Sequence, residues 1–320
     1  MALYLGIDGA GVRTTAIVAN EHGKILAKFV GNSIDYKTIG LLTARQNLKS
    51  IIRELCNKTG EKSFRCACIG STALNSRASV KETESLTANI IDADKIILDS
   101  SIFTAMECML GTGPCALVIS GIDSMVAARS SKGKMTNAGG WGYLLGNEGS
   151  GYAIAMDAIR HAIRVYEGSE EPSKLLEEML EFFDVYNPAE LKEKFYDPVT
   201  ERSKISAFAG RVFSCASAGD KKSLEIVSDH ARLLAGSTIS LLKKFPADTS
   251  IGLWGGVFVY NRRFRNEFAS AMYSQSPDYK IELLNYPAEC GALFAAYKMD
   301  SIEISGELMK NIDLYRGVRV

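Results

Sequence analysis

Asp8 ends an apolar run that favours a β-strand, and glycines follow it at positions 9 and 11. A hairpin turn formed by residues 8–11 would present consecutive N–H groups with little side-chain bulk, which suits phosphate oxygens. Asp8 would then hold Mg²⁺ through water. A plain hairpin turn capped by an aspartate has the same composition, so the segment alone leaves both interpretations open.

Asp99 ends a second apolar run, residues 96–98, and precedes Ser100 and Ser101. A carboxylate at a strand end can accept the proton of an attacking hydroxyl, which phosphoryl transfer requires of a general base. The same side chain would also suit the N-cap of a helix that starts at Ser101, and the two roles are compatible. We predict a general base at Asp99.

The glycine segment, Ala138–Gly151, has six glycines among its fourteen residues. Such density lets the backbone approach a ligand, and Trp141 and Tyr143 add flat apolar faces that pack well against sugar rings. Helical periodicity begins near 148–150, so free N–H groups of a helix start would face the segment. The alternative is a glycine-rich turn before a surface helix. We predict one wall of a small-molecule site.

These residues require a scaffold of alternating strands and helices. Three β-favouring runs open the chain, the pattern then becomes α/β, and near 111–114 it restarts with two strands before the glycine segment. A second domain that opens like the first indicates an internal repeat. We expect domains at 1–114 and 115–320, and we leave open the alternative that the last helices pack back on the N-terminal domain. The expected strands are 3–8, 13–20, 24–30, 65–70, 95–99, 116–121, 125–130, 250–254 and 280–284, with helices at 41–58, 79–90, 101–110, through most of 148–245, at 261–274 and at 289–299.

Composition restricts the function classes. Lys plus Arg (37) equals Asp plus Glu (37), so no global field favours nucleic acid or a membrane surface. Seven cysteines without a CxxC pair, beside three histidines, read as reduced thiols rather than a zinc site or a disulfide framework. The N-terminus lacks a signal-peptide pattern, and no apolar run is long enough to span a membrane. We expect a cytoplasmic protein without a nucleic-acid or membrane partner.

Five segments of the sequence carry a resemblance: Gly6–Gly11, Asp99, Ser120–Ser124, Gly139–Gly142 with Gly146–Gly151, and Gly255–Phe258. In this order they resemble the N-acetylglucosamine kinase family, which is grouped with the BadF/BadG-type ATPases in the sugar kinase, Hsp70 and actin superfamily. The resemblance runs from Leu5 to about Tyr297. It implies an α/β fold of two RNase-H-like (actin/hexokinase-type ATPase) domains flanking a nucleotide-binding cleft. It also implies ATP with Mg²⁺, phosphoryl transfer to a hydroxyl of an amino sugar, and a homodimer.

The resemblance also assigns roles to individual residues. Asp99 falls on the catalytic-base position, and Asp8 on the position that holds Mg²⁺. The implied ATP-binding residues are Asp8, Gly9, Gly11, Arg13, Gly121, Ser124, Gly255 and Gly256, of which the last two belong to the adenosine pocket. The implied sugar-binding residues are Asp35, Tyr36, Gly140, Trp141, Asn147 and Glu148.

Several phosphate-binding positions depart from the family pattern. Val12 and Ile122 each replace a threonine, Ala10 replaces a glycine, and Asp123 replaces a glycine. Two hydroxyl donors are therefore missing. Asp123 adds a negative charge that would repel phosphate unless Mg²⁺ or a cation such as Arg13 compensates. The sequence predicts weakened ATP binding.

The sugar-binding positions also depart from the pattern. Asp35 and Met125 each replace an asparagine, and Asn147 replaces an aspartate. An amide accepts hydrogen bonds from hydroxyls less strongly than a carboxylate, and a buried Asp35 would need a donor. The acceptor sugar therefore stays open.

Two other functions remain open. An ATPase activator of a radical acyl-CoA dehydratase shares the superfamily fold, but needs paired cysteines at a dimer axis for an iron–sulfur cluster. Cys66 and Cys68 fall in a predicted buried strand instead. A non-catalytic sugar- or nucleotide-binding descendant is the second, because Val12, Ile122 and Asp123 alter the phosphate loops. Sugar-dependent release of ADP distinguishes a kinase from both.

Overall fold

The computed structural model describes residues 1–74, 80–110, 113–197, 202–284 and 286–317. The chain forms two compact units, Met1–Gly111 with Leu284–Val320, and Thr112–Leu283. The chain thus returns to the first unit after completing the second. Residue 79 of the predicted helix 79–90, and residues 111 and 112 of the predicted boundary, lie outside the described residues.

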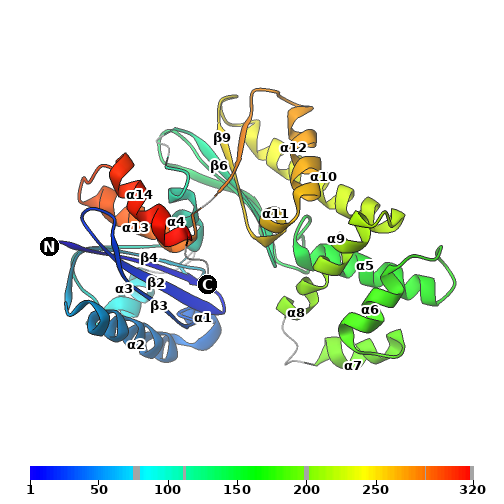
Figure 1. The fold of residues 1–320 in the computed structure, drawn as a ribbon, viewed down its shortest axis with the longest axis horizontal. Helices are drawn as coiled ribbons and strands as arrows, with labels where there is room; N and C mark the ends of the chain where they lie inside the picture. The colour runs from blue at the N-terminus through cyan, green and yellow to red at the C-terminus, as the bar shows by residue number, and fades with distance from the viewer. Residues whose placement is uncertain (75–79, 111–112, 198–201, 285, 318–320) are drawn as a thin grey trace. The chain divides into compact units, whose positions relative to one another are not determined.

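A five-stranded mixed sheet in the order β3-β2-β1-β4-β5 forms the centre of the first unit (Figure 1). The first three strands are antiparallel neighbours, and β4 and β5 continue the sheet in parallel with β1. The predicted meander followed by parallel strands is confirmed. The strands are β1 (Leu3–Ala10), β2 (Arg13–Asn20), β3 (Ile25–Asn32), β4 (Ser63–Ser71) and β5 (Asp92–Asp99).

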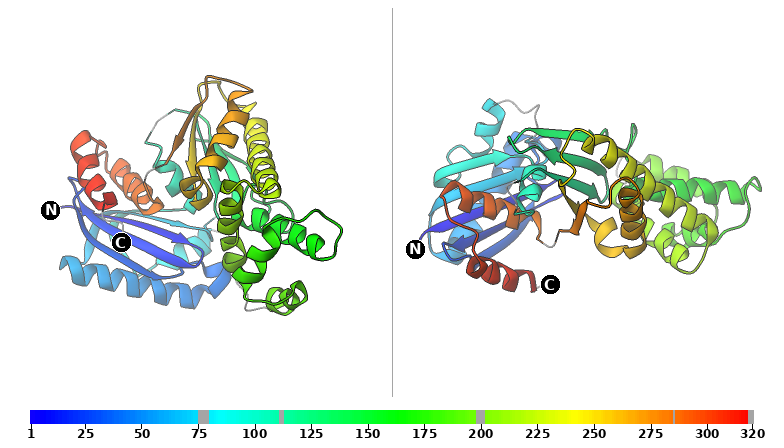
Figure 2. Two further views of the ribbon diagram at one scale, coloured as in Figure 1. Left: turned by 45° about the vertical axis from the view of Figure 1, so that its right-hand side comes forward. Right: turned by 90° about the horizontal axis from the view of Figure 1, so that it is seen from above.

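Helices cover both faces of this sheet, as the two views of Figure 2 show. Leu5 and Ile7 of β1 pack with α2 (Leu41–Thr59) in one core. Tyr4 points to the opposite face and packs with α13 (Ala288–Met299). Because side chains alternate along a strand, Gly6 and Asp8 also belong to the α13 face. The other helices of this unit are α1 (Tyr36–Ile39), α3 (Val80–Thr87), α4 (Ser101–Glu107) and α14 (Gly306–Gly317).

The second unit repeats this sheet in the order β10-β9-β6-β7-β8. Its first three strands are again antiparallel and its last two parallel to the first, which confirms the internal repeat. The sequence did not predict β8, because Met135–Gly139 is polar, small and only partly buried. The strands are β6 (Cys115–Ser120), β7 (Ser124–Arg129), β8 (Met135–Gly139), β9 (Ser250–Trp254) and β10 (Lys280–Leu283).

A run of helices separates β8 from β9 and builds most of the core of the second unit. The longest helix, α10, packs against α12, α9 and α5. Phe258, Phe264 and Phe268 join the same core. The helices between β8 and β9 are α5 (Gly151–Tyr166), α6 (Leu175–Phe183), the 3₁₀ helix η1 (Pro188–Glu190), α7 (Leu191–Tyr196), α8 (Arg202–Ala207), α9 (Ala209–Ser217) and α10 (Lys221–Leu242). Two more helices, α11 (Gly256–Tyr260) and α12 (Arg262–Tyr273), lie between β9 and β10.

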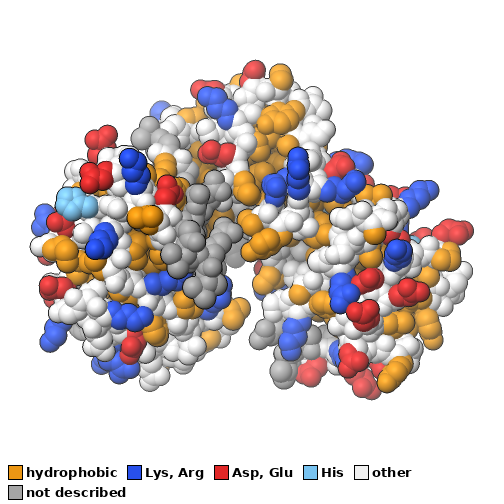
Figure 3. All heavy atoms as spheres, in the orientation of Figure 1, with side chains coloured by type: hydrophobic (Ala, Val, Ile, Leu, Met, Phe, Trp, Pro, Cys, Tyr) orange, Lys and Arg blue, Asp and Glu red, His pale blue; other side chains and the backbone are white. Residues whose placement is uncertain are grey.

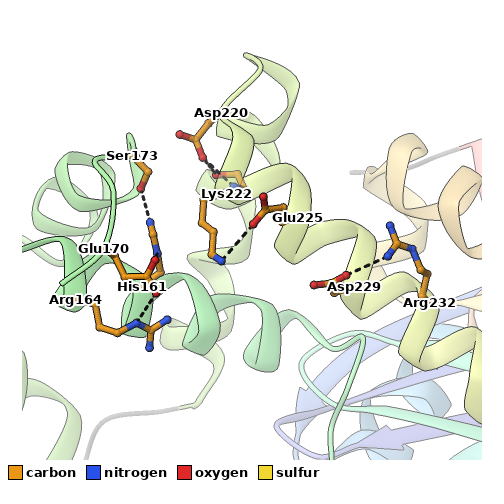
Figure 4. A network of polar contacts seen from close by, with 10 residues as sticks. His161, Arg164, Glu170, Ser173, Asp220, Lys222, Glu225, Asp229 and Arg232 are labelled. Carbon is orange, nitrogen blue, oxygen red and sulfur yellow. Dashed lines mark hydrogen bonds and ion pairs between the residues drawn. The ribbon is translucent and has the colours of Figure 1, made fainter.

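A polar network fastens the connection between α5 and α6 to α5 itself (Figure 4). His161 Nε2 lies 3.0 Å from Ser173 Oγ, and Arg164 pairs with Glu170 at 3.2 Å. Asp220 caps the start of α10 and also accepts from the Lys174 N–H. These contacts join α5, the connection that follows it and the start of α10.

Candidate functional site

Strand register brings Asp8 and Asp99 to one edge of the first sheet. Asp8 pairs with Gly70 across β1 and β4, and Gly70 pairs with Asp99 across β4 and β5. Two strand spacings place the two aspartate backbones about 10 Å apart. A Cβ at Gly70 would meet Thr104 Oγ1 at 2.5 Å, so the middle position admits no side chain. The carboxyl edge of these parallel strands therefore carries two carboxylates in one row.

The Asp8 carboxylate is buried and short of partners. The side chain is 9% exposed, and its Oδ1 has no hydrogen-bond partner among the described residues. Burial, with a smaller contribution from nearby Glu289, raises the pKa of Asp8 to about 7. A buried carboxylate without donors fits a hydrated Mg²⁺, because a divalent cation would supply the missing positive charge.

The hairpin turn differs from the predicted one. Strands β1 and β2 pair as far as Ala10 and Arg13, so the turn consists of Gly11 and Val12 rather than residues 8–11. Gly11 has φ +55° and open space around it, whereas a Cβ at Gly9 would meet Ile34 Cγ1 at 2.5 Å. The predicted phosphate cradle is thus partly strand: Gly9 is required for packing, and only Gly11 lies in the turn. Val12 and Arg13 are exposed beside it.

One carboxylate oxygen of Asp99 is hydrogen-bonded to the neighbouring residue, and the other has no hydrogen bond among the described residues. Its Oδ1 accepts from Ser100 N at 2.6 Å and from Ser100 Oγ at 3.2 Å. The N-cap of α4 is Ser100, whose hydroxyl oxygen accepts from Phe103 N at 3.2 Å. The capping role considered for Asp99 therefore belongs to its neighbour. Among the described residues Asp99 Oδ2 makes no hydrogen bond, so it can receive a proton.

The first unit also holds the two residues assigned to the sugar near position 35. Asp35 is buried, and its two oxygens accept from Lys37 N at 3.1 Å and Thr72 Oγ1 at 2.6 Å. The expected donors for a buried Asp35 are therefore present. Tyr36 lies in the hydrophobic core, where its hydroxyl donates to Ala73 O at 3.4 Å.

In the second unit the 120–124 loop and the end of the glycine segment are joined by hydrogen bonds. Asn147 Oδ1 accepts from Ser124 N at 2.7 Å, and Ser124 Oγ donates to Glu148 O at 2.7 Å. Gly151 N donates to Gly121 O at 2.7 Å. The structure thus brings four predicted site residues together: Gly121, Ser124, Asn147 and Glu148.

Two departures from the family pattern explain each other here. Asn147 Nδ2 donates to Asp123 Oδ1 at 3.0 Å, and an aspartate at 147 would instead oppose one carboxylate with another. Arg202 pairs with Asp123 at 3.0 Å as well. The charge of Asp123 therefore has a partner inside its own unit, which the sequence did not reveal.

The middle of the glycine segment exposes its aromatic residues. Gly140 and Gly142 have positive φ, and a bridge joins Gly142 to Gly146. Trp141 is 68% exposed. Tyr143 packs edge-on against the Tyr152 ring at 5.4 Å, and the Arg202 guanidinium lies over its ring at 4.9 Å. Tyr143 is thereby fixed, while Trp141 offers an open face.

Gly255 lies against the 120–124 loop. It has φ +108°, and a Cβ there would meet Ser120 O at 2.2 Å. Gly256 follows as the first residue of α11. Parallel pairing of β6 with β9 brings these segments to one sheet edge, the counterpart of the edge that carries Asp8. The predicted adenosine role of both glycines stays a prediction.

Sequence reasoning missed three side chains that act on these sites. Glu289 is a single buried acid in the apolar helix α13 and influences Asp8. Arg202 pairs with Asp123, and His230 of α10 accepts from Gly149 N at 3.1 Å. A buried acid or histidine inside an apolar helical stripe is a signal that could have identified Glu289 and His230. Nothing in the sequence marks Arg202.

Comparisons with known proteins agree with this organisation. The model of the BadF/BadG/BcrA/BcrD ATPase family matches residues 5–296. The N-acetylmuramic acid/N-acetylglucosamine kinase of Clostridium acetobutylicum is 24% identical over 301 residues, which is 92% of this chain and 98% of the relative. The N-acetyl-D-glucosamine kinase of Dictyostelium discoideum is 25% identical over 258 residues, 77% of this chain and 81% of the relative.

Solved structures share the fold. A candidate N-acetylglucosamine kinase from Chromobacterium violaceum has a TM-score of 0.74 at 18% identity and covers 92% of this chain and 98% of its own. A ROK family glucokinase from Streptomyces griseus, in complex with glucose and AMPPNP, has a TM-score of 0.58 at 14% identity with the same coverage. The fold is that of the two-domain actin/hexokinase-type ATPases. Within this class, the chain belongs to the BadF/BadG/BcrA/BcrD ATPase family.

The cysteines and the surface bear on the other functions. All seven cysteines are free, and Cys66 and Cys68 are buried in β4 beneath α13, where they cannot form an exposed pair. Among the described residues, no helix has the length and apolarity to cross a membrane. On the face drawn in Figure 3, acidic and basic side chains are interspersed within each unit, without a single-sign field.

Proposed function

We propose that this protein is an ATP-dependent kinase of N-acetylglucosamine or a related amino sugar. The observation that carries the proposal is the row formed by Asp8 and Asp99, with a partnerless buried oxygen on one and an open oxygen on the other. Family membership and the two kinases named above support the same activity. Mg²⁺ bound near Asp8 would neutralise charge on the phosphates.

In this proposal Asp99 Oδ2 accepts the proton of the sugar hydroxyl as that oxygen attacks the γ-phosphorus, and ADP leaves. Hydrogen bonds from Ser100 hold the other oxygen of Asp99, so the carboxylate has one orientation. A carboxylate that is held in one orientation can accept the proton late in the reaction, so this proposal needs no histidine as the general base.

The sugar is recognised by the glycine segment. Trp141 offers an exposed ring to the apolar face of a pyranose. The Glu148 carboxylate is exposed and has no partner among the described residues, so it is free to accept from sugar hydroxyls. Asn147, by contrast, is buried, and both its amide oxygen and its amide nitrogen are hydrogen-bonded within the protein, so it acts by shaping the segment.

The altered phosphate loops weaken ATP binding through the loss of hydroxyls and not through Asp123. Val12 and Ile122 are exposed and cannot donate to phosphate. Asp123 is neutralised by Arg202 and bonded by Asn147, so its repulsion of phosphate is reduced. A non-catalytic descendant is the second candidate, and the missing hydroxyls are the observation that favours it.

The test is a panel of amino sugars with ATP and Mg²⁺, read as ADP release with and without each sugar. Sugar-dependent release supports the kinase. Sugar-independent release supports an activator-type ATPase, and sugar binding without release supports the descendant. Sedimentation of the same preparation checks the homodimer that we propose by family resemblance. The seven free thiols suit the reducing cytoplasm, which we propose as the compartment.

A further inference from the structure

His230 connects helix α10 to the peptide that follows Glu148. The imidazole is buried, its Nδ1 accepts from Gly149 N at 3.1 Å, and its Nε2 lies 3.1 Å from Asp157 Oδ2. Because Nδ1 accepts a hydrogen bond, the ring proton is on Nε2, which donates to Asp157. This hydrogen bond is the main reason why the pKa of Asp157 lies below its usual value. One neutral tautomer is thereby fixed.

The Gly149 backbone lies directly on α10. Its φ is +81°, and a Cβ at this position would meet Leu234 Cβ at 2.7 Å and His230 O at 3.2 Å. No side chain fits between the segment and the helix at this position. The imidazole nitrogen is therefore the acceptor on which the buried Gly149 N–H depends.

The other side of the same segment is held by the sheet. Ser120 Oγ donates to Gly149 O, and Ser124 Oγ donates to Glu148 O at 2.7 Å. Gly149 is thus hydrogen-bonded from two sides, to β6 through its carbonyl and to α10 through its N–H. The residue before it, Glu148, keeps an exposed carboxylate whose direction depends on these backbone contacts.

We propose that His230 is a positioning residue of the sugar site: the Gly149 N–H to Nδ1 hydrogen bond fixes the backbone that aims Glu148 at the sugar. The proposal rests on the proposed function for its kinetic consequence, but not for the hydrogen bond itself. Because this hydrogen bond supports the residue that follows Glu148, its loss should raise the sugar KM more than the ATP KM.

Two variants separate the two bonds of the ring. His230→Asn places an amide oxygen where Nδ1 lies and keeps the acceptor for Gly149, while it loses Asp157. His230→Gln reaches Asp157 and loses the acceptor. We expect His230→Gln to raise the sugar KM about tenfold and to lower the melting temperature, because it leaves the buried Gly149 N–H without an acceptor, whereas His230→Asn should stay close to wild type in both. Equal effects of both variants on sugar KM would overturn the proposal.

Two measurements on the ligand-free protein do not depend on the activity. Exchange of the Gly149 amide hydrogen should be about tenfold faster in His230→Gln than in His230→Asn, and equal rates overturn the positioning role. In the wild type, which has only three histidines, ¹⁵N spectra should show an unprotonated Nδ1 for His230 at neutral pH. A protonated Nδ1 overturns it even if the glutamine variant does not fold. A wild type without sugar-dependent turnover, but with both results as expected, removes the proposed function alone.

Discussion

The carboxyl edges of the two sheets have the same strand topology, but they differ in whether their polar side chains are hydrogen-bonded within the protein. In the first unit the edge carries two carboxylates, Asp8 and Asp99, each with one oxygen that has no hydrogen-bond partner among the described residues. In the second unit Ser124, Asn147 and Gly149 have their polar groups paired within the protein. One duplicated scaffold has therefore been used in two ways.

This difference has a physical basis. A group that must exchange a proton or hold a cation cannot have its charge satisfied by the protein, because satisfaction would lower its reactivity. A loop that must present a ligand-binding surface needs its buried polar groups to be hydrogen-bonded within the protein, since each unpaired group would allow the loop to rearrange. We infer that the first edge supplies chemistry and the second supplies shape.

The largest effect is expected at Asp99. Asp99→Asn keeps the size of the side chain and its contacts with Ser100 but removes the base, so turnover should fall by about 10²–10⁴. Sugar affinity, measured by calorimetry, should stay within a few-fold of wild type. Turnover near the wild-type value would show that the open oxygen of Asp99 takes no part in the reaction.

Asp8 should reveal its unsatisfied charge through stability. Its folded-state pKa of about 7 lies above the usual aspartate value, so ionisation in the folded state costs stability, and this cost grows as pH rises from about 4 to about 7. Without Mg²⁺, Asp8→Asn should raise the free energy of unfolding by up to about 4 kcal/mol at about pH 8, and by much less at about pH 5.

Chemical denaturation in EDTA at the two pH values measures this effect. Mg²⁺ should stabilise the wild type and not the variant. Glu289→Gln is a matched control, because it should shrink the pH dependence only in part while it keeps an acceptor for the Tyr315 hydroxyl. A pH-independent difference between Asp8→Asn and wild type would mean that Asp8 is not buried as an ionisable group.

Substitutions in the two phosphate loops test whether the Asp123 carboxylate is held by its partners within the second unit or faces the phosphates. Val12→Thr with Ile122→Thr should tighten ATP binding by about 10²-fold or more, since each restored hydrogen bond to a charged phosphate contributes about 1.5–3 kcal/mol. Adding Asp123→Gly should bring no further gain, because it leaves Arg202 and Asn147 without their partner. ATP titration at fixed Mg²⁺ measures all three proteins. A further large gain from Asp123→Gly would show that its charge does face the phosphates.

The smallest effect is expected at Trp141, whose ring is already exposed. Trp141→Ala should weaken sugar binding about tenfold and leave ATP binding and the melting temperature unchanged. Calorimetry with sugar and with ATP separates the two affinities. Tyr143→Phe is the control, because that ring is packed against Tyr152 and Arg202 and its hydroxyl has no assigned role. Unchanged sugar affinity in Trp141→Ala would remove the ring from the binding surface.

The local pattern was enough to predict the elements that carry the chemistry. Alternating apolar residues place β1 and its antiparallel partners, and the strand-ending position of Asp99 follows from residues 96–98. Ser150 was expected near the start of a helix and is the N-cap of α5. These features depend on neighbours in the chain, so periodicity and capping preferences reveal them.

Only the tertiary structure decided which of these residues have partners. The turn moved to Gly11 and Val12 because strand pairing continued beyond Asp8. Asp8 is buried, and the nearby charge that acts on it belongs to Glu289 of α13, close to the other end of the chain. Asp123 gained Arg202 from α8, and Gly149 gained His230 from α10. The spacing of residues in the sequence cannot predict such contacts, because burial and pairing between distant segments are determined when the sheets and helices pack.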